Sequence, residues 1–217
     1  MSDPVEIDDG APEPGRLFVI AAPSGAGKTT LVHRLMGANA SLKFSISYTT
    51  RPRRETEADG EDYNFVTKDA FRAMIDGGDF LEHAEVFDHY YGTSKSQVEG
   101  MLNTGDNVIL EIDWQGAQQV RSHMPDCRSI FILPPSVDEL KNRLTGRGTD
   151  SPEVIERRYR DAVSDMSHWH EFDYAVINDD LEAAGEELAA IVSGAESSLE
   201  NSTDNPAMQS RVRAILA

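Results

Sequence analysis

The 217-residue chain has little cysteine, few basic residues and no long apolar segment, and each shortage excludes a class of protein. Its single cysteine, Cys127, excludes an internal disulfide and any metal site built from several cysteines. No apolar run approaches the roughly 18 residues that cross a bilayer. The acidic start of the chain is also unlike a signal peptide. We therefore expect a cytoplasmic protein without a membrane partner.

Basic residues are scarce and unevenly placed. Lysine and arginine total 20 against 38 aspartate and glutamate residues, which gives a formal net charge of −18. Residues 1–15 carry five acids and no base, and residues 179–217 carry eight acids and two arginines, so the ends contribute −5 and −6 and residues 16–178 the remaining −7. Nucleic acids and anionic membranes need a basic footprint, so we expect neither as a partner.

A glycine-rich segment follows the apolar run at residues 17–21. It reads Ala22-Pro23-Ser24-Gly25-Ala26-Gly27-Lys28-Thr29-Thr30. Between a strand and a helix, this pattern is typical of a loop whose backbone N–H groups bind the phosphates of a nucleoside triphosphate. Lys28 can reach the β- and γ-phosphates, and the Thr29 hydroxyl can bind Mg²⁺. Only Ala22 departs from G-x-x-x-x-G-K-[ST]. A glycine-rich turn with an incidental lysine is the disfavoured alternative.

Apolar runs alternate with helical patterns along the chain. Continuous apolar runs predict buried parallel strands at residues 17–21, 108–112, 129–133 and 174–177. Helical spacing predicts helices at 29–36, 95–102, 115–124, 137–144, 152–166 and 181–192, with Ser94, Ser136 and Ser151 as caps. This alternation indicates an α/β fold of the P-loop NTPase type, a doubly wound parallel sheet.

The expected organisation has three parts. Residues 1–15, rich in acids and proline, predict a disordered leader, and residues 193–217 predict a polar linker and a short C-terminal helix. Between them, residues 16–192 predict one domain. Its core comprises 16–44 and 95–192. Residues 45–94 break the alternation with short strands and one helix at 68–76, so we expect an insertion that supplies a second substrate site.

Arginines begin this insertion. Arg51 and Arg54 flank Pro52, and their planar guanidinium groups could clamp the phosphate of an acceptor. The alternative is a solvated polar loop. Hydroxyl groups in the same insertion, and Glu82 in the apolar context of residues 80–83, favour a binding site, since a carboxylate in such a strand needs a partner.

A second group of arginines comprises Arg143, Arg147 and Arg158, with glycines at positions 146 and 148. Glycine beside arginine indicates a mobile lid, over about residues 143–158, that brings cations onto the transferring phosphate when substrates bind. The alternative is a helix end whose basic residues interact favourably with the helix dipole.

Two acids lie near the end of the strand expected at 108–112. Glu111 and Asp113 are two residues apart, so both side chains point to one side of the strand. Open α/β sheets bind ligands at the carboxyl ends of their strands. One acid can order Mg²⁺ through water while the other reads a base edge. Capping of the following helix is the competing interpretation and is compatible with either role.

Residues 16–192 resemble the bacterial guanylate kinases. The matching segments are residues 21–28, 45–51, 60–63, 80–84, 90–93, 112–116, 131–136, 147–148 and 176–180. Segments 45–51 and 90–93 separate this family from adenylate, uridylate and shikimate kinases, which share only the glycine-rich loop. The alanine at position 22 also occurs in bacterial members of the family.

The resemblance implies transfer of the ATP γ-phosphoryl group to GMP and dGMP, with Mg²⁺ as cofactor and ATP and GMP as partners. The implied GMP-binding residues are Ser47, Arg51, Arg54, Tyr63, Glu82, Tyr91, Thr93 and Asp113. The implied ATP-binding residues are 22–30 (Ala22 to Thr30) with Arg143 and Asn178. The implied catalytic residues are Lys28, Arg51, Arg147 and Arg158, and Mg²⁺ would be held by Thr29 and, through water, by Glu111, where many relatives carry aspartate.

Two other functions stay open from the residues. A non-catalytic module of the same family would bind a phosphorylated peptide or GMP alone, but it would be expected to lose the loop lysine or the lid arginines. Another P-loop kinase would act on a different nucleoside monophosphate or a small alcohol, which the pair Glu82 and Asp113 disfavours. The sequence also leaves a homo-oligomer open.

Overall fold

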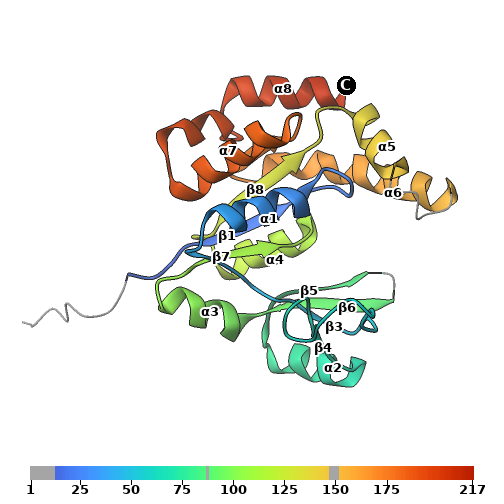
Figure 1. The fold of residues 1–217 in the computed structure, drawn as a ribbon, viewed down its shortest axis with the longest axis vertical. Coiled ribbons are helices and arrows are strands. Elements are labelled where there is room, and N and C mark those ends of the chain that lie inside the picture. Colours follow the sequence, from blue (N-terminus) through green and yellow to red (C-terminus); the bar gives the residue numbers. More distant parts are fainter. Residues whose placement is uncertain (1–12, 87, 147–151) are drawn as a thin grey trace, which may run out of the picture.

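A parallel five-stranded sheet forms the centre of the computed structural model, which describes residues 13–86, 88–146 and 152–217 (Figure 1). The strand order is β2-β7-β1-β8-β9, and all neighbouring strands are parallel. A parallel sheet needs cover on both faces. Its strands are β1 (Leu17–Ala21), β2 (Leu42–Phe44), β7 (Asn107–Glu111), β8 (Arg128–Leu133) and β9 (Tyr174–Ile177).

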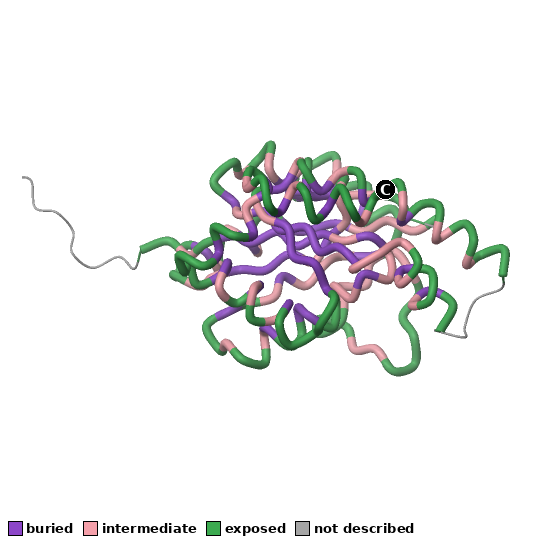
Figure 2. The backbone as a smooth tube through the Cα atoms, turned by 90° about the horizontal axis from the view of Figure 1, so that it is seen from above, coloured by how far each residue is buried: buried purple, intermediate pink, exposed green. Residues whose placement is uncertain are grey.

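Helices cover both faces, so the buried strands run through the middle of the molecule (Figure 2). Strand β1 illustrates the cause. Phe18 and Ile20 belong to one apolar cluster, whereas Leu17, Val19 and Ala21 belong to the cluster on the opposite face, because side chains alternate along a strand. The first cluster packs under α1 (Lys28–Ala38) and α7 (Leu181–Ser193), and the second under α3 (Lys95–Asn103), α4 (Trp114–His123), α5 (Val137–Thr145), α6 (Pro152–Met166) and α8 (Pro206–Leu216).

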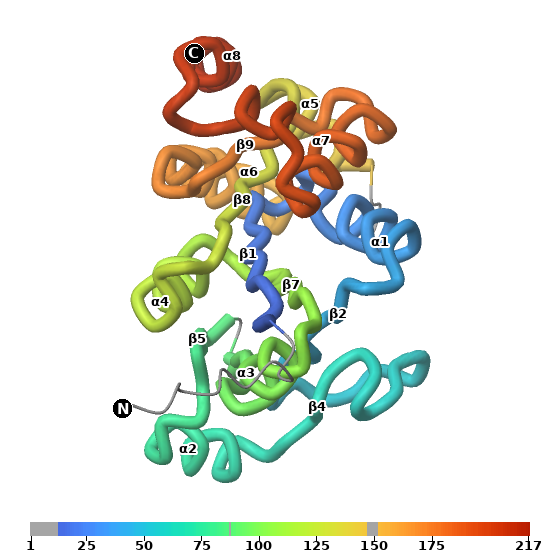
Figure 3. The backbone as a smooth tube through the Cα atoms, turned by 90° about the vertical axis from the view of Figure 1, so that its left-hand side faces the viewer, coloured from blue at the N-terminus to red at the C-terminus, as the bar shows by residue number. Residues whose placement is uncertain are grey.

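A second, four-stranded sheet lies between β2 and α3 in the sequence. Its order is β4-β3-β6-β5, with β5 at one edge. Figures 1 and 3 show this unit beside α3, at the end of the molecule away from α7 and α8. Its elements are β3 (Tyr48–Thr49), β4 (Asn64–Phe65), α2 (Lys68–Gly77), β5 (Phe80–Val86) and β6 (His89–Ser94).

This unit has a small aromatic core of its own. The Phe71 ring, fully buried on α2, stacks on Phe80 with a centroid distance of 4.5 Å and on Tyr90 at 5.5 Å. Strand β6 approaches closely at Gly92, where a Cβ would lie 3.0 Å from the rings of Phe71 and Phe80. The insertion therefore holds its shape around Phe71.

The predicted doubly wound α/β fold is confirmed. The four expected strands and the expected core helices end within two residues of the predicted positions. Ser94 and Ser136 cap their helices by accepting hydrogen bonds from the backbone N–H groups of Gln97 and Glu139. The three-residue edge strand β2 was not predicted. The expected cap Ser151 lies outside the described residues.

The segment after α7 packs along the edge strand β9. A 3₁₀ helix spans Glu196–Asn201. Thr203 Oγ1 then donates to the Phe172 carbonyl at 2.5 Å, and Asn201 Nδ2 donates to the Ala175 carbonyl at 3.2 Å. The polar residues of this segment thus pair with backbone at the sheet edge. Among the described residues, no helix combines the length and apolar character needed to cross a bilayer.

Removing the Phe71 ring should destabilise the protein, because this ring lies at the centre of the aromatic core of the insertion. Emptying a buried aromatic site costs about 3–5 kcal/mol, so Phe71→Ala should lower the free energy of unfolding in urea by that amount. The neighbouring variant Arg72→Ala, whose side chain is 60% exposed, should stay within about 0.5 kcal/mol of the wild type. Equal stability of the two variants would contradict this account.

Candidate active site

The glycine-rich loop joins β1 to α1 and bends through two left-handed residues. Gly25 and Gly27 have φ angles of +93° and +92°. Leu31 N–H donates to the Gly27 carbonyl, so Gly27 begins the hydrogen bonding of α1. A Cβ at Gly27 would lie 2.4 Å from Asn178 Nδ2. Glycine is therefore required there by both conformation and space.

Two predicted ATP-binding residues hold the backbone of this loop through hydrogen bonds. Asn178, a buried residue after β9, donates through Nδ2 to the Ala26 carbonyl at 2.7 Å. Arg143, in the last turn of α5, donates to the Asn178 carbonyl at 3.0 Å and is held by Glu139 at 2.9 Å. Arg143 also donates to the Ala26 carbonyl at 3.5 Å, so both side chains contact the loop backbone, and neither lines the hollow in front of it.

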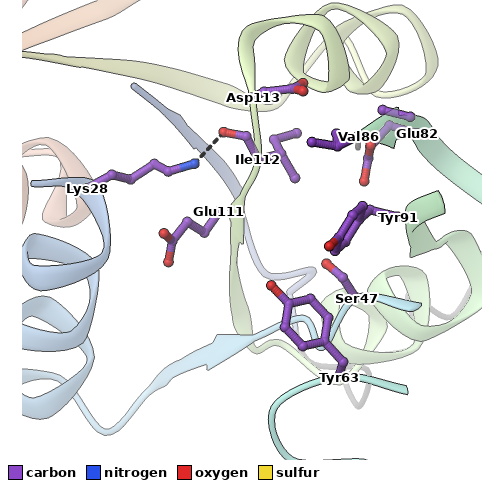
Figure 4. A pocket seen from close by; sticks show the side chains of 10 residues that line it. Lys28, Ser47, Tyr63, Glu82, Val86, Tyr91, Glu111, Ile112 and Asp113 are labelled. Carbon is purple, nitrogen blue, oxygen red and sulfur yellow. Dashed lines mark hydrogen bonds between the residues drawn. The ribbon is translucent and has the colours of Figure 1, made fainter. Parts of the chain in front are cut away.

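Two hollows open at the carboxyl ends of the central strands. One, of about 350 Å³, lies over the glycine-rich loop. The other, of about 340 Å³, lies between the central sheet and the insertion (Figure 4). Lys28 and Asp113 line both. Two ligands bound in these hollows would therefore meet at one lysine and one carboxylate.

Lys28 is held at the junction of the hollows. Its Nζ donates to the Ile112 carbonyl at 2.6 Å (Figure 4). Burial lowers the pKa of Lys28 below its ordinary value of 10.5, while three nearby carboxylates, led by Glu111, act in the opposite direction. A phosphate brought between the hollows would add negative charge beside this ammonium group.

Thr29 and Glu111 offer oxygen atoms that fit a magnesium ion. Thr29 Oγ1 donates to Glu111 Oε1 at 2.5 Å. Mg²⁺ usually takes one or two protein oxygens and fills its remaining positions with water and substrate phosphates. In the described ranges there is no cluster of three or more metal-ligating His, Cys, Asp or Glu residues. The donor set therefore fits an ion that arrives with a triphosphate, rather than one held by protein alone.

Glu82 and Asp113 converge on the second hollow. Glu82 is 5% exposed, and Thr93 Oγ1 donates to its Oε1 at 2.6 Å. Burial raises the pKa of Glu82 to about 7. Asp113 caps α4 by accepting from Gly116 N–H at 2.7 Å, so the expected capping role is present and is combined with a position in the hollow. These groups can accept hydrogen bonds from a ligand rich in N–H donors.

Arg51 is held by Glu57, a residue that the sequence analysis missed. Its two terminal nitrogens donate to the Glu57 carboxylate at 3.1 and 2.6 Å, and its guanidinium lies 5.4 Å from the centre of the Tyr63 ring. This hydrogen-bonded ion pair raises the pKa of Arg51 and lowers that of Glu57. Arg54 donates through its backbone to Glu57 at 2.8 Å, but its side chain is 73% exposed. A six-residue separation inside a loop gives no periodic signal for this pair.

The structure brings most of the predicted residues to the hollows. Those around the loop are Ala22, Pro23, Ser24, Gly25, Gly27, Lys28, Thr29, Thr30 and Asp113, and those of the second hollow are Lys28, Ser47, Tyr63, Glu82, Tyr91, Glu111 and Asp113. Two other predicted residues are not part of these linings. Thr93 donates a hydrogen bond to Glu82, which lines the second hollow, and Ala26 is buried.

Besides Arg143, four other predicted arginines either do not line these hollows or lie outside the described residues. Among the described residues, Arg51, Arg54 and Arg158 are not part of either lining, and Arg147 lies outside the described residues. Asp165, on α6, does line the loop hollow, and it accepts a hydrogen bond from Trp114 Nε1 at 2.9 Å. It was missed because a lone acid in a charged helix carries no motif.

This sheet, its glycine-rich loop and the adjoining hollows define a protein of the P-loop NTPase fold with two hollows that share a lysine. A family model described as guanylate kinase matches residues 14–195. The guanylate kinase of Alkalilimnicola ehrlichii is 57% identical over 178 residues, covering 82% of this chain and 88% of the relative. That of Hydrogenovibrio crunogenus is 58% identical over 177 residues, covering 82% and 86%.

A solved structure agrees with these relatives. The crystal structure of guanylate kinase from Anaplasma phagocytophilum matches with a TM-score of 0.68 and 31% identity, covering 85% of this chain and 87% of the other. The chain belongs to the guanylate kinase family. The resemblance read from the sequence is thereby confirmed.

A methyl group at Gly27 should damage the loop. The added Cβ would clash with Asn178 Nδ2 at 2.4 Å and would strain a φ angle of +92°. We expect Gly27→Ala to weaken ATP binding, measured by calorimetry, by at least about tenfold. Gly37→Ala, on α1 with open space around its Cβ, is the matched control and should keep ATP affinity while gaining about 0.5–1 kcal/mol of stability. Unchanged ATP affinity in both variants would refute the requirement for glycine at position 27.

Proposed function

We propose that this chain is a guanylate kinase that transfers the γ-phosphoryl group of ATP to GMP, giving GDP and ADP, and that it also accepts dGMP in the recycling of purine nucleotides. The observation that carries the proposal is the pair of adjoining hollows that share Lys28 and Asp113. Membership of the guanylate kinase family supports it. Because ATP and GMP are nucleotides of the cytoplasm, we also propose that the enzyme works there.

The second hollow suits guanine better than adenine. Guanine presents N1–H and N2–H₂ donors, which the carboxylates of Glu82 and Asp113 can accept, and an O6 acceptor to which the Ser47 hydroxyl can donate. Thr93 would contribute to base recognition by holding the Glu82 carboxylate. Adenine has an acceptor at N1, which would face a carboxylate. A site built around polar pairs rejects a base that leaves them unpaired far more strongly than an apolar pocket does.

We assign the GMP phosphate to the arginine and tyrosine groups of the insertion. Tyr63 and Tyr91 line the second hollow, with ring centres 6.0 Å apart. The Arg51 guanidinium lies 5.4 Å from the centre of the Tyr63 ring, and it interacts electrostatically with Tyr91. Planar guanidinium groups bind phosphate bidentately. Arg54, in the same loop, would be a further group that binds the GMP phosphate.

We assign the triphosphate to the glycine-rich loop, residues 22–30, with Arg143 and Asn178 as ATP-binding residues that hold the backbone of that loop. Thr29, and Glu111 through water, would hold Mg²⁺, which supplies charge neutralisation for the phosphates. The transfer needs no covalent intermediate, because in-line positioning and offset of negative charge account for most phosphoryl-transfer catalysis. Lys28 and Arg51 would hold the two phosphates in line, and Arg147 and Arg158 would complete the charge offset from the lid.

Acceptor specificity tests the proposed function directly. ADP formation from ATP and Mg²⁺ should occur with GMP and dGMP but fall by at least about a hundredfold with AMP, UMP and CMP, because only guanine satisfies both carboxylates. Turnover with a different monophosphate would overturn the assignment of the second hollow. Absence of turnover with every acceptor, while GMP still binds, would instead indicate a non-catalytic module.

The raised pKa of Glu82 predicts a pH dependence of GMP binding. Its value of about 7 means that about half of the side chains are neutral at pH 7 and most at pH 6. A protonated carboxyl cannot accept both guanine donors, so the GMP Kd should be about fivefold larger at pH 6 than at pH 7 and should improve less than twofold at pH 8.

The control is Glu82→Gln, measured over the same pH range. Dividing the two pH profiles removes the titration of the GMP phosphate itself, which both proteins experience. Asp113 and Lys28, the charged groups that act on Glu82, are present in both proteins. A ratio that does not change between pH 6 and pH 8 would show that Glu82 binds guanine without changing its protonation.

A further inference from the structure

The edge strand β5 carries Glu82, and its pairing is irregular at that point. Phe80 pairs with Ser94 and Glu82 with Thr93, so Leu81 is an extra residue in β5. Such a bulge redirects the side chains around it and is common beside active sites. Here Leu81 is 1% exposed within the core cluster that includes α3 and α4, whereas Glu82 lines the second hollow.

The residue after Glu82 is held by one side chain of the core. Gln119, on α4, accepts from His83 N–H through Oε1 and donates through Nε2 to the His83 carbonyl, both at 3.1 Å. These are backbone groups of an edge strand, on the side away from β6. An edge strand exposes such groups to solvent unless another element covers them. The Gln119 amide therefore takes the place of a neighbouring strand at this one position.

Helix α4 thus presents three residues to β5 at a spacing of three. Asp113 caps the helix and lines the second hollow, Gly116 faces the Glu82 carboxylate, and Gln119 binds His83. A Cβ at Gly116 would lie 2.9 Å from Glu82 Oε2 and 3.2 Å from Asp113 Oδ1. Residues three apart share a helix face. One face of α4 therefore sets the position of both carboxylates.

We propose that Gln119 is a positioning residue for guanine recognition: by fixing the backbone of β5 to α4, it holds Glu82 in register with Asp113. This inference rests on the proposed function. Leu81 of β5 packs in the apolar cluster that includes α3 and α4. Apolar contacts tolerate sliding, whereas two hydrogen bonds to the N–H and the carbonyl of one residue fix both the position and the orientation of the strand. Small displacements of a binding group reduce specificity strongly.

The test compares GMP with IMP, whose base lacks the N2 amino group that the carboxylate pair recognises. In Gln119→Ala and Gln119→Met, the KM for GMP should rise about tenfold, and the preference for GMP over IMP should fall at least about fivefold. The KM for ATP should stay within about twofold, because Gln119 does not line the loop hollow. A loss caused by general unfolding would instead lower kcat for both acceptors and leave their ratio unchanged.

The control is Gln118→Ala on the same helix. Gln118 is exposed and donates to Glu171 instead of β5, so its removal should leave the acceptor ratio unchanged. Gln119→Glu retains an acceptor for His83 N–H, so its preference for GMP over IMP should lie between those of the wild type and Gln119→Ala. This variant replaces the other two in the test if they fold poorly. A GMP-to-IMP ratio within about twofold of wild type in all Gln119 variants would overturn the inference, whereas a wild-type protein inactive on GMP would overturn the proposed function itself.

Discussion

The parallel pairing of β1 with β7 is the constraint on which the whole site depends. In this register Ile20 lies opposite Glu111, so both strands end at the same level. The loop after β1 therefore meets the acids at the end of β7, and Lys28 Nζ reaches the Ile112 carbonyl at 2.6 Å. A shift of one residue would turn the side chains of either strand to the opposite face and separate these groups. The buried apolar residues on both faces of β1 make such a shift costly.

The charged groups of the site suit ligands that carry both phosphates and N–H donors. Burial moves the pKa of Lys28 downward and that of Glu82 upward, so burial disfavours the charged form of each group. The partners inside the protein, mainly Glu111 for Lys28 and the Thr93 hydroxyl for Glu82, only partly compensate. A phosphate beside Lys28 and a guanine edge beside Glu82 would favour the charged form of each. We therefore expect ligand binding in this site to be coupled to the ionisation of Lys28 and Glu82.

Local patterns made much of the fold and of the loop predictable. The apolar run 17–21 and the glycines at 25 and 27 specify strand, turn and helix within a few residues, and Ser94 and Ser136 mark helix starts. The sequence gives weaker signals where contacts are distant. Strand β2 has three residues, one of them buried, too few for a periodic pattern. The contact of Gln119 with His83 spans 36 positions, and the Glu57 partner of Arg51 lies in an irregular loop. Such partners follow only from the folded arrangement.

We propose that two nucleotides meet at Lys28, and that Glu82 and Asp113 bind the base of one of them. The most direct measurement is a crystal structure with GMP, Mg²⁺ and a non-hydrolysable ATP analogue. We expect the N1 and N2 groups of guanine to lie within hydrogen-bond distance, about 3 Å, of the two carboxylates, and the terminal phosphate of the analogue to lie beside Lys28. A GMP base bound away from both carboxylates, or both nucleotides competing for the loop hollow, would contradict it.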